Sequence, residues 1–189
     1  MNLTDILTER RNNSAKVIPA DKQVIMKRAT DALIREDLSS KALSVGDSLP
    51  EFTLGNSKGD LVSLKSFDSD YLVISFYRGG WCPYCNFELK ALQEVLPELK
   101  ELNGELIAIT PETSDNSLTT LEKNELTFSI LSDIDNLYAK ELGLAFQLPE
   151  ELQKVYKDFG IEVDKHNEND DFELPMPATY IVNKKREII

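Results

Sequence analysis

One segment of this chain constrains its fold more than any other. Residues 71–77 are apolar almost throughout, with no alternation of apolar and polar positions. Such a run is typical of a strand that is buried on both faces of a parallel sheet, because an exposed face would require polar residues at every second position. We therefore expect this segment to be the central strand of an α/β domain.

Strand and helix patterns alternate on both sides of this segment. Residues 52–54 and 61–64 flank Asn56-Ser57-Lys58-Gly59, which predicts a hairpin. The later alternation predicts a mostly parallel sheet with right-handed crossovers. The elements expected there are a helix from Pro83 with a kink or break at Pro97, a strand over 106–109, a helix from Ser114 or Asp115 to Glu122, a strand over 128–131, helices over 133–142 and 149–159, an acidic loop over 167–173 and a strand over 179–182.

The first 45 residues differ from the rest of the chain. They carry a small excess of basic residues, whereas the whole chain has a net charge of −12. After Pro19, with Asp21 as N-cap or first-turn acid, apolar residues recur at helical spacing. These residues are Val24, Ile25, Ala29, Ala32, Leu33 and Leu38. We expect a helical leader that packs on the domain surface, with a recruiting or oligomerising arm as the alternative.

Charge and composition exclude several classes of function. A net charge of −12 repels nucleic acid and anionic membrane surfaces. No apolar run approaches the roughly 20 residues of a membrane-spanning helix, and the start of the chain lacks the apolar region of a secretion signal. We therefore expect a cytoplasmic protein with no nucleic-acid or membrane partner.

The chemically distinctive segment is Arg78-Gly79-Gly80-Trp81-Cys82-Pro83-Tyr84-Cys85, between the buried strand and the next helix. At a helix N-terminus, free N–H groups and the helix dipole favour an anion. We expect the pKa of Cys82 to fall to between about 3.5 and 7.5, from about 8.5 for a free thiol. Cys85 lies one turn later on the same face and can attack a sulfur bonded to Cys82. These positions predict Cys82 as the nucleophile and Cys85 as the resolving thiol.

Three other interpretations of the two cysteines remain open. A structural disulfide across so short a loop contributes roughly 2 kcal/mol, and a reducing cytosol does not maintain it. A zinc site needs His166 and a carboxylate, but His166 lies far along the chain in a polar loop, where we expect it to be exposed. Two inert buried thiols are the third possibility. Gly79 and Gly80 favour redox chemistry, because they indicate backbone that another group approaches closely.

The segment 76–85 resembles the active-site loop of the peroxiredoxin-like branch of the alkyl hydroperoxide reductase and thiol-specific antioxidant (AhpC/TSA) family, which belongs to the thioredoxin-fold superfamily. The resemblance covers residues 46–189 and leaves 1–45 outside. It implies a thioredoxin-like α/β fold, with a central mixed sheet flanked by helices, an N-terminal hairpin and the helical leader. Further residues that match are Gly46, Asp47, Pro50, Phe52, Leu54, Gly59, Val62 and Leu64 in the hairpin, the segment 130–133, and the proline loop and strand at 177–182.

The resemblance also implies a cis peptide at Met176-Pro177 beside the thiols, a trans proline that begins a strand being the alternative. Two positions depart from the family. Gly79 stands where peroxiredoxins place Thr or Ser, and Pro177 where they place Arg. Arg78 is a candidate for the missing positive charge, with a surface ion pair as the other interpretation. Trp81 before the first cysteine is more similar to thioredoxins.

The family implies a thiol peroxidase that reduces hydrogen peroxide or organic hydroperoxides and is regenerated by an external thiol reductant such as a thioredoxin-like protein. It implies no metal and no organic cofactor. A thiol-disulfide oxidoreductase acting on protein disulfides is the main alternative, because it needs the same dithiol. A non-enzymatic redox sensor is a third class.

The sequence ends at Ile189, before the strand and final helix that the family usually adds. We expect this end to leave a sheet edge or an apolar face that pairing, the leader helix or a homodimer must cover.

Overall fold

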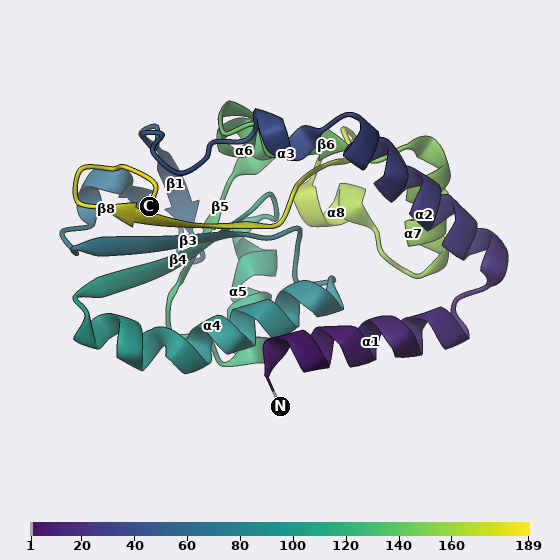
Figure 1. Cartoon of the computed structure of the whole chain (residues 1–189), viewed down its shortest axis with the longest axis horizontal. Helices are drawn as coiled ribbons and strands as arrows, with labels where there is room; N and C mark the ends of the chain where they lie inside the picture. Colours follow the sequence, from purple (N-terminus) through teal and green to yellow (C-terminus); the bar gives the residue numbers. More distant parts are fainter. Residues whose placement is uncertain (1) are drawn as a thin grey trace.

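The computed structural model describes residues 2–189 and has a six-stranded sheet at its centre, with helices on both faces (Figure 1). The strand order is β2-β1-β5-β4-β3-β8, and β6 and β7 form a separate pair. The strands are β1 (Thr53–Asn56), β2 (Leu61–Ser63), β3 (Tyr71–Phe76), β4 (Gly104–Thr110), β5 (Ser129–Ser132), β6 (Ala145–Gln147), β7 (Glu173–Pro175) and β8 (Ala178–Asn183). The helices are α1 (Leu3–Val17), α2 (Ala20–Arg35), α3 (Leu38–Lys41), α4 (Pro83–Glu101), α5 (Ser114–Asn124), α6 (Leu137–Glu141), α7 (Glu150–Asp158) and α8 (Val163–Asn167).

The apolar segment at 71–77 forms β3, as predicted. β3 pairs in parallel with β4 and antiparallel with β8, and β4 pairs in parallel with β5, so the sheet is mixed. The β1–β2 hairpin adds antiparallel strands at the far edge. The expected α/β fold with a central mixed sheet and an N-terminal hairpin is confirmed.

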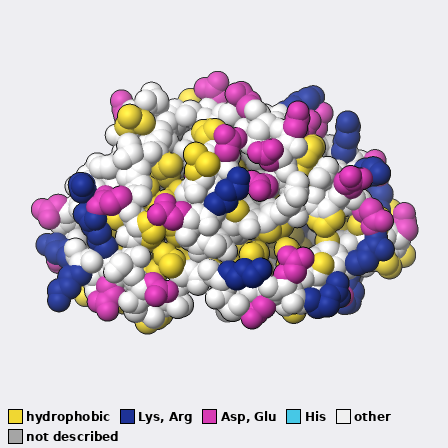
Figure 2. All heavy atoms as spheres, turned by 90° about the horizontal axis from the view of Figure 1, so that it is seen from above, with side chains coloured by type: hydrophobic (Ala, Val, Ile, Leu, Met, Phe, Trp, Pro, Cys, Tyr) yellow, Lys and Arg dark blue, Asp and Glu magenta, His cyan; other side chains and the backbone are white. Residues whose placement is uncertain are grey.

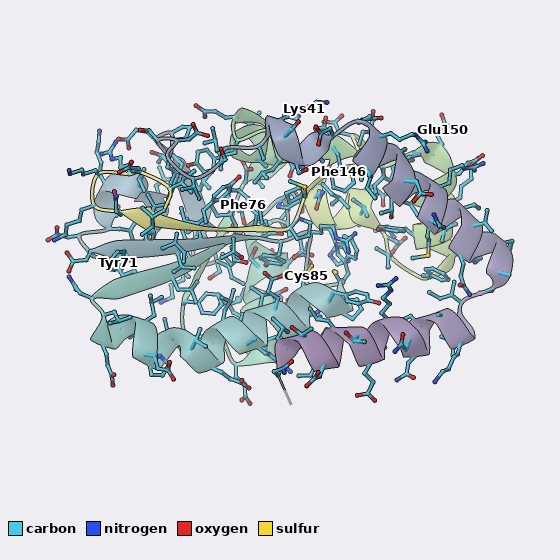
Figure 3. All side chains as sticks on the ribbon, viewed as in Figure 1. Lys41, Tyr71, Phe76, Cys85, Phe146 and Glu150 are labelled. Carbon is cyan, nitrogen blue, oxygen red and sulfur yellow. The ribbon has the colours of Figure 1, made fainter. Side chains whose placement is uncertain are left out.

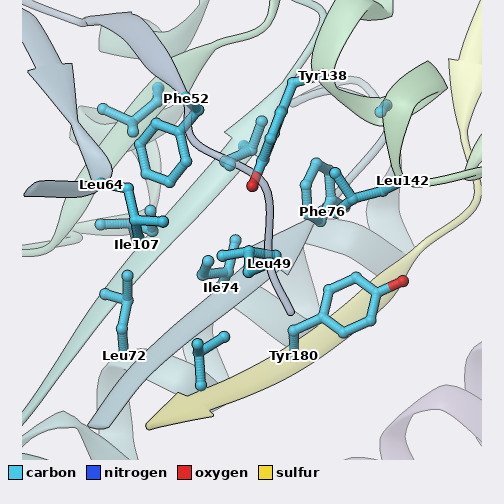
Figure 4. Packing of buried hydrophobic residues seen from close by; sticks show 14 of the residues in the cluster. Leu49, Phe52, Leu64, Leu72, Ile74, Phe76, Ile107, Tyr138, Leu142 and Tyr180 are labelled. Carbon is cyan, nitrogen blue, oxygen red and sulfur yellow. The ribbon is translucent and has the colours of Figure 1, made fainter. Parts of the chain in front are cut away.

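Side chains of β3 alternate between two apolar layers, which explains why the strand has no polar face. Leu72, Ile74 and Phe76 belong to the layer that Figure 4 shows, where they pack with aromatic residues such as Phe52 and Tyr138. Val73 and Tyr77 point into the opposite layer, beneath α4. Both cysteines belong to this second layer, so the dithiol lies inside the core of the domain.

The leader forms two long helices. The predicted helix is α2, which begins at Ala20 after Pro19 and packs against α7. Its buried residue is Ala29, which joins an apolar cluster with Leu152 and Val155 of α7. The sequence analysis did not predict α1, which contacts α4 and has no buried side chain. A helix without a buried face leaves only a weak periodic signal in the sequence.

Two predicted helices have different limits. Pro97 does not break α4, which continues to Glu101. The proline removes one backbone hydrogen bond, but Leu96 is buried beside it and tertiary packing holds the helix together. The helix predicted over 133–142 begins only at Leu137, because Asp135 and Asn136 have positive φ. The buried Asp133 carboxylate instead accepts hydrogen bonds from the N–H groups of Tyr138 and Ala139 in the first turn of α6.

The predicted acidic loop at 167–173 was too long. Its first residue ends helix α8, and its last residue begins strand β7, which pairs with β6.

The outer edge of β8 is covered in part by the chain itself. Val182 forms a bridge with Ile188, and the N–H of Ile189 bonds to the carbonyl of Ile181. Ile188 also exchanges backbone hydrogen bonds with Gly46 and Asp47, and its side chain is buried. The expected uncovered edge is therefore closed locally by pairing. A homodimer stays a prediction.

Replacing Ile74 by Ala tests the two-layer core. Ile74 is completely buried in β3, so we expect the free energy of unfolding in urea to fall by about 2–5 kcal/mol. The matched control is Leu61→Ala in β2, where the side chain is 75% exposed and a change within about 0.5 kcal/mol is expected. Equal effects of the two substitutions would contradict this description of the core.

Candidate redox site

The two cysteines lie at the start of α4, where the chain leaves the central strand. Cys82 is the N-cap residue of α4, Pro83 is its first residue, and Cys85 follows in the first turn. Figure 3 shows Cys85 at this end of α4, near the middle of the molecule. Proline is favoured at a first helical position because its missing N–H has no partner to lose there. The sequence therefore fixes Cys82 at the positive end of the helix dipole.

Arg78 contacts the first cysteine directly. Its Nη2 lies 3.2 Å from Cys82 Sγ, and its Nη1 donates to the hydroxyl of Tyr156 at 3.1 Å. The guanidinium also lies over the Trp81 ring, 5.6 Å from the ring centroid, and Trp81 meets the Tyr156 ring edge-on. Arg78 is thus oriented by two aromatic side chains, and the surface ion pair considered from the sequence is not its role.

The pKa of Cys82 is lowered to about 5. The largest cause is a hydrogen bond from the Cys85 thiol, and the positive charge of Arg78 adds to it, while burial opposes both. A thiol with this pKa is almost entirely thiolate at neutral pH.

Cys85 has the opposite environment. Its pKa is raised well above its ordinary value, because its proton is shared with the neighbouring Cys82 sulfur and because the group is buried. Both cysteines are free, and their residues are 1% and 3% exposed, respectively. One thiolate and one thiol side by side constitute the arrangement in which the first attacks an oxidant and the second resolves the product.

A buried carboxylate holds the loop before the cysteines. Glu112 is 1% exposed, and its Oε2 accepts the N–H of Gly80 at 2.8 Å. Its other oxygen, Oε1, lies 3.0 Å from His166 Nδ1. His166, which lies in α8, is therefore partly buried against Glu112. The prediction of an exposed histidine was wrong. Its neighbour is a loop-holding carboxylate rather than the cysteines, and residues 2–189 contain no cluster of three or more metal-ligating side chains.

Asn86 ties the loop to the helix. Its Nδ2 donates to the carbonyls of Gly80 and Cys82, and Asn124 of α5 donates to its Oδ1. Gly80 lies so close to Thr120 that a Cβ there would overlap its hydroxyl, and a Cβ on Gly79 would meet the Trp81 ring. The close approach predicted from the two glycines is confirmed.

The prediction for Pro177 was wrong. Residues 2–189 contain no cis peptide bond, so Met176-Pro177 is trans. The chain runs extended from β7 into β8 here, and the N–H of Met176 bonds to the carbonyl of Leu144. Pro177 itself is exposed. This segment reaches α4 through Thr179, whose hydroxyl donates to Glu88 Oε1.

The structure brings together four of the five site residues chosen from the sequence, namely Arg78, Trp81, Cys82 and Cys85, and adds several that were missed. Asn86 and Glu112 carried a usable signal, because one follows the dithiol directly and the other follows a parallel strand, β4, at its carboxyl end. Tyr156 carried none. It lies 78 positions after Arg78, on a helix whose placement depends on the tertiary fold.

Comparison with known proteins agrees with this arrangement of fold and dithiol. Residues 45–189 match the model of the AhpC/TSA family, and the chain belongs to that family. Peroxiredoxin Bcp of Escherichia coli K12 is 28% identical over 102 residues, which are 54% of this chain and 65% of that protein. The chloroplastic peroxiredoxin Q of Sedum lineare is 27% identical over 121 residues, covering 64% and 65% of the two chains. The aligned part thus spans about two thirds of these relatives.

A solved structure supports the fold independently. The peroxidoxin BcpB of Mycobacterium tuberculosis superposes with a TM-score of 0.63, covering 77% of this chain and 82% of that one at 17% identity. The likeness establishes the thioredoxin-like fold of the domain. The leader at 1–45 lies outside the family match except for its last residue, and the division of the chain at residue 46 stays a prediction.

The hydrogen bond between the two thiols predicts how the pKa of Cys82 responds to substitution. Ultraviolet absorbance of the thiolate should titrate with a midpoint of about 5 in the wild type and lose this step in Cys82→Ser. Cys85→Ala should raise the midpoint, because the donor is lost, whereas Cys85→Ser keeps a hydroxyl donor and should raise it less. A wild-type midpoint near the roughly 8.5 of a free thiol would contradict the described electrostatics.

Proposed function

We propose that this protein is a thiol peroxidase that reduces hydrogen peroxide or organic hydroperoxides, with Cys82 and Cys85 as its catalytic residues. The observation that carries the proposal is the contact between Arg78 Nη2 and Cys82 Sγ. A fixed cation beside a buried thiolate can stabilise the negative charge that moves onto the peroxide oxygens in the transition state. Membership of the AhpC/TSA family and relatives named as peroxiredoxins support the same chemistry.

The reaction begins at the Cys82 thiolate. Sγ attacks the terminal oxygen of the hydroperoxide, an S–O bond forms and the O–O bond breaks. The electron pair leaves with the second oxygen, which takes the proton of Cys85 and departs as water or an alcohol. Cys82 is now a sulfenic acid and Cys85 a thiolate.

The second step closes the disulfide. The Cys85 thiolate attacks Cys82 Sγ, the S–S bond forms, and hydroxide leaves and takes a proton from solvent to become water. An external dithiol, such as a thioredoxin-like protein, then supplies two electrons and two protons to restore both thiols. The site needs neither a metal nor an organic cofactor for these steps. Free thiols of this kind fit a reducing compartment, which favours the cytoplasm.

Arg78 replaces residues that the family usually uses to hold the peroxide. Gly79 and Pro177 occupy those positions here, and neither has a side chain that donates a hydrogen bond. The Arg78 guanidinium is a fixed donor beside Sγ, and the start of α4 adds the positive end of the helix dipole. Trp81 supports this arrangement by stacking on Arg78 and packing on Tyr156.

A thiol-disulfide oxidoreductase remains the alternative. The exposure of Cys82 argues for a small oxidant, because a residue that is 1% exposed admits a peroxide more readily than a protein disulfide.

The described helices of residues 2–189 include none with an apolar stretch long enough to cross a membrane.

Stopped-flow kinetics of the reduced protein separate the two activities. Trp81, the one tryptophan of the chain, is next to Cys82 and reports its oxidation by fluorescence. Ionisation alone makes a low-pKa thiol react roughly thirtyfold faster at neutral pH than a free thiol with a pKa near 8.5. The rate of a peroxidase must therefore exceed that of a free thiol by more than this factor. Arg78→Ala should slow peroxide reduction by about tenfold or more if the guanidinium contributes 1.4 kcal/mol in the transition state.

Arg10→Ala, in the exposed part of α1, is the matched control and should leave the rate unchanged. A wild-type rate no faster than the thiolate fraction predicts, together with rapid reduction of a protein disulfide such as insulin, would replace the peroxidase by the oxidoreductase.

A further inference from the structure

We propose that the cavity between the leader and α7 binds a small apolar carboxylate, and that it binds this ligand more tightly when Cys82 and Cys85 form a disulfide. The carboxylate contacts Arg78, and its apolar part lies between α2 and α7. This ligand regulates the dithiol and is not converted by it. The inference goes beyond the peroxidase function proposed above and needs only that the two thiols form a disulfide.

The cavity has the size and lining of a small-molecule site. Its volume is about 790 Å³, within the range of roughly 300–1,000 Å³ that is typical of such pockets. One wall consists of α2 and α3, with Met26 and Leu33 among its residues. The opposite wall consists of the segment from β6 to α7, including Leu148 and Leu152. Figure 2 looks onto the molecule from above and shows hydrophobic side chains lying open between acidic and basic ones. An apolar chain or ring can therefore bury its surface against both walls.

Arg78 gives this cavity its preference for a negative charge. Arg78 and Tyr156 both line it, and Arg78 Nη1 donates to the Tyr156 hydroxyl, so this pair forms part of the wall. The charged side chains Glu36 and Lys41 also line the cavity, but they are exposed and opposite in sign. Among residues 2–189 the lining includes neither cysteine. A ligand with one carboxylate can thus meet the guanidinium without meeting a sulfur.

The negative partner of Arg78 is the Cys82 thiolate. Nη2 lies 3.2 Å from Cys82 Sγ, and the ion pairs within residues 2–189 include none between Arg78 and a carboxylate. Arg78 Nε is buried and has no hydrogen-bond partner within the described part of the chain. Burial raises the pKa of Tyr156, so its hydroxyl stays neutral. The compensation of the Arg78 charge therefore depends on the redox state of Cys82.

Disulfide formation removes this compensation. The two sulfurs pass two electrons and the proton of Cys85 to the oxidant, an S–S bond forms, and neither sulfur keeps a charge. The guanidinium then has no anionic partner in a largely buried position, which costs free energy. A carboxylate in the cavity restores the partner through charge-assisted hydrogen bonds. In the reduced protein the thiolate already fills this role and repels a second anion, so the affinity is lower.

Ligand binding and redox state influence each other in both directions. If the ligand binds the disulfide form tenfold more tightly, the ligand shifts the redox equilibrium tenfold toward the disulfide. At saturation the reduction potential of the dithiol then falls by about 30 mV. An apolar carboxylate thus favours the oxidised protein.

Calorimetric titration with octanoate tests the inference on the wild-type protein. The disulfide form is prepared with diamide, a thiol oxidant whose action does not need peroxidase activity, and the reduced form with dithiothreitol. Octanoate should bind the disulfide form at least about tenfold more tightly, because it replaces the missing thiolate as partner of a buried cation. The uncharged control, 1-octanol, should bind the two forms within about twofold of each other. Equal affinity of octanoate for both forms, no binding to either, or an equally large redox dependence for 1-octanol would overturn the inference.

Cys82→Ser separates the loss of charge from any change of shape in the disulfide form. This variant has no thiolate beside Arg78 and cannot form the disulfide, so it should bind octanoate as tightly as the oxidised wild type under reducing conditions. An affinity equal to that of the reduced wild type would contradict the role given to Arg78. Redox-dependent binding in a protein that does not reduce hydrogen peroxide would instead overturn the peroxidase function alone.

Filling the cavity tests the location of the ligand. Ala32 lines the cavity from α2, so Ala32→Trp should weaken octanoate binding to the disulfide form by about tenfold or more. The matched control is Ile34→Trp, at a 70% exposed position of the same helix outside the lining, which should leave the affinity unchanged. Undiminished binding by a folded Ala32→Trp protein would place octanoate elsewhere and overturn the site.

Discussion

The contact between the Arg78 guanidinium and Cys82 Sγ is the interaction on which the site depends. Both groups are largely buried, and burying an isolated charge there would cost free energy of folding. The positive guanidinium and the negative thiolate each offset this cost for the other. Loss of Arg78 would leave a buried thiolate with only the Cys85 proton and the helix N-terminus to stabilise it. The difference between the two thiols, one ionised and one protonated, follows from this contact and from their shared hydrogen bond.

Separate parts of the chain converge to hold these two groups. β3 and α4 supply the loop and the N-cap position, Glu112 from the end of β4 anchors the Gly80 N–H, and Tyr156 from α7 orients Arg78. The leader enters the same arrangement, because α2 packs on α7 and thereby supports the helix that carries Tyr156. The fold thus links the first helices of the chain to the orientation of one guanidinium.

The sequence predicted the features that depend on local pattern. The apolar run at 71–77 favours a strand buried on both faces, and the dithiol after it lies at a helix start, so β3 and the positions of Cys82 and Cys85 could be predicted. Features that depend on tertiary packing did not follow. Tyr156 and His166 reach the site from a distant segment, α1 has no buried face to produce a periodic signal, and Leu96 beside Pro97 maintains a helix that local propensity would break. Residues 2–189 contain no cis proline, although the family resemblance implied one: Met176-Pro177 is trans, and the Met176 N–H bonds to the carbonyl of Leu144.

The most direct test of the account identifies the sulfur that peroxide oxidises. Reduced Cys85→Ala and Cys82→Ala proteins are each treated with an equimolar amount of hydrogen peroxide in the presence of dimedone, which traps sulfenic acid, and the labelled peptide is identified by mass spectrometry. The account predicts rapid labelling of Cys82 in the first protein and almost none of Cys85 in the second, because only Cys82 has the contact with Arg78 and the lowered pKa. Preferential labelling of Cys85, or labelling of neither sulfur, would contradict it.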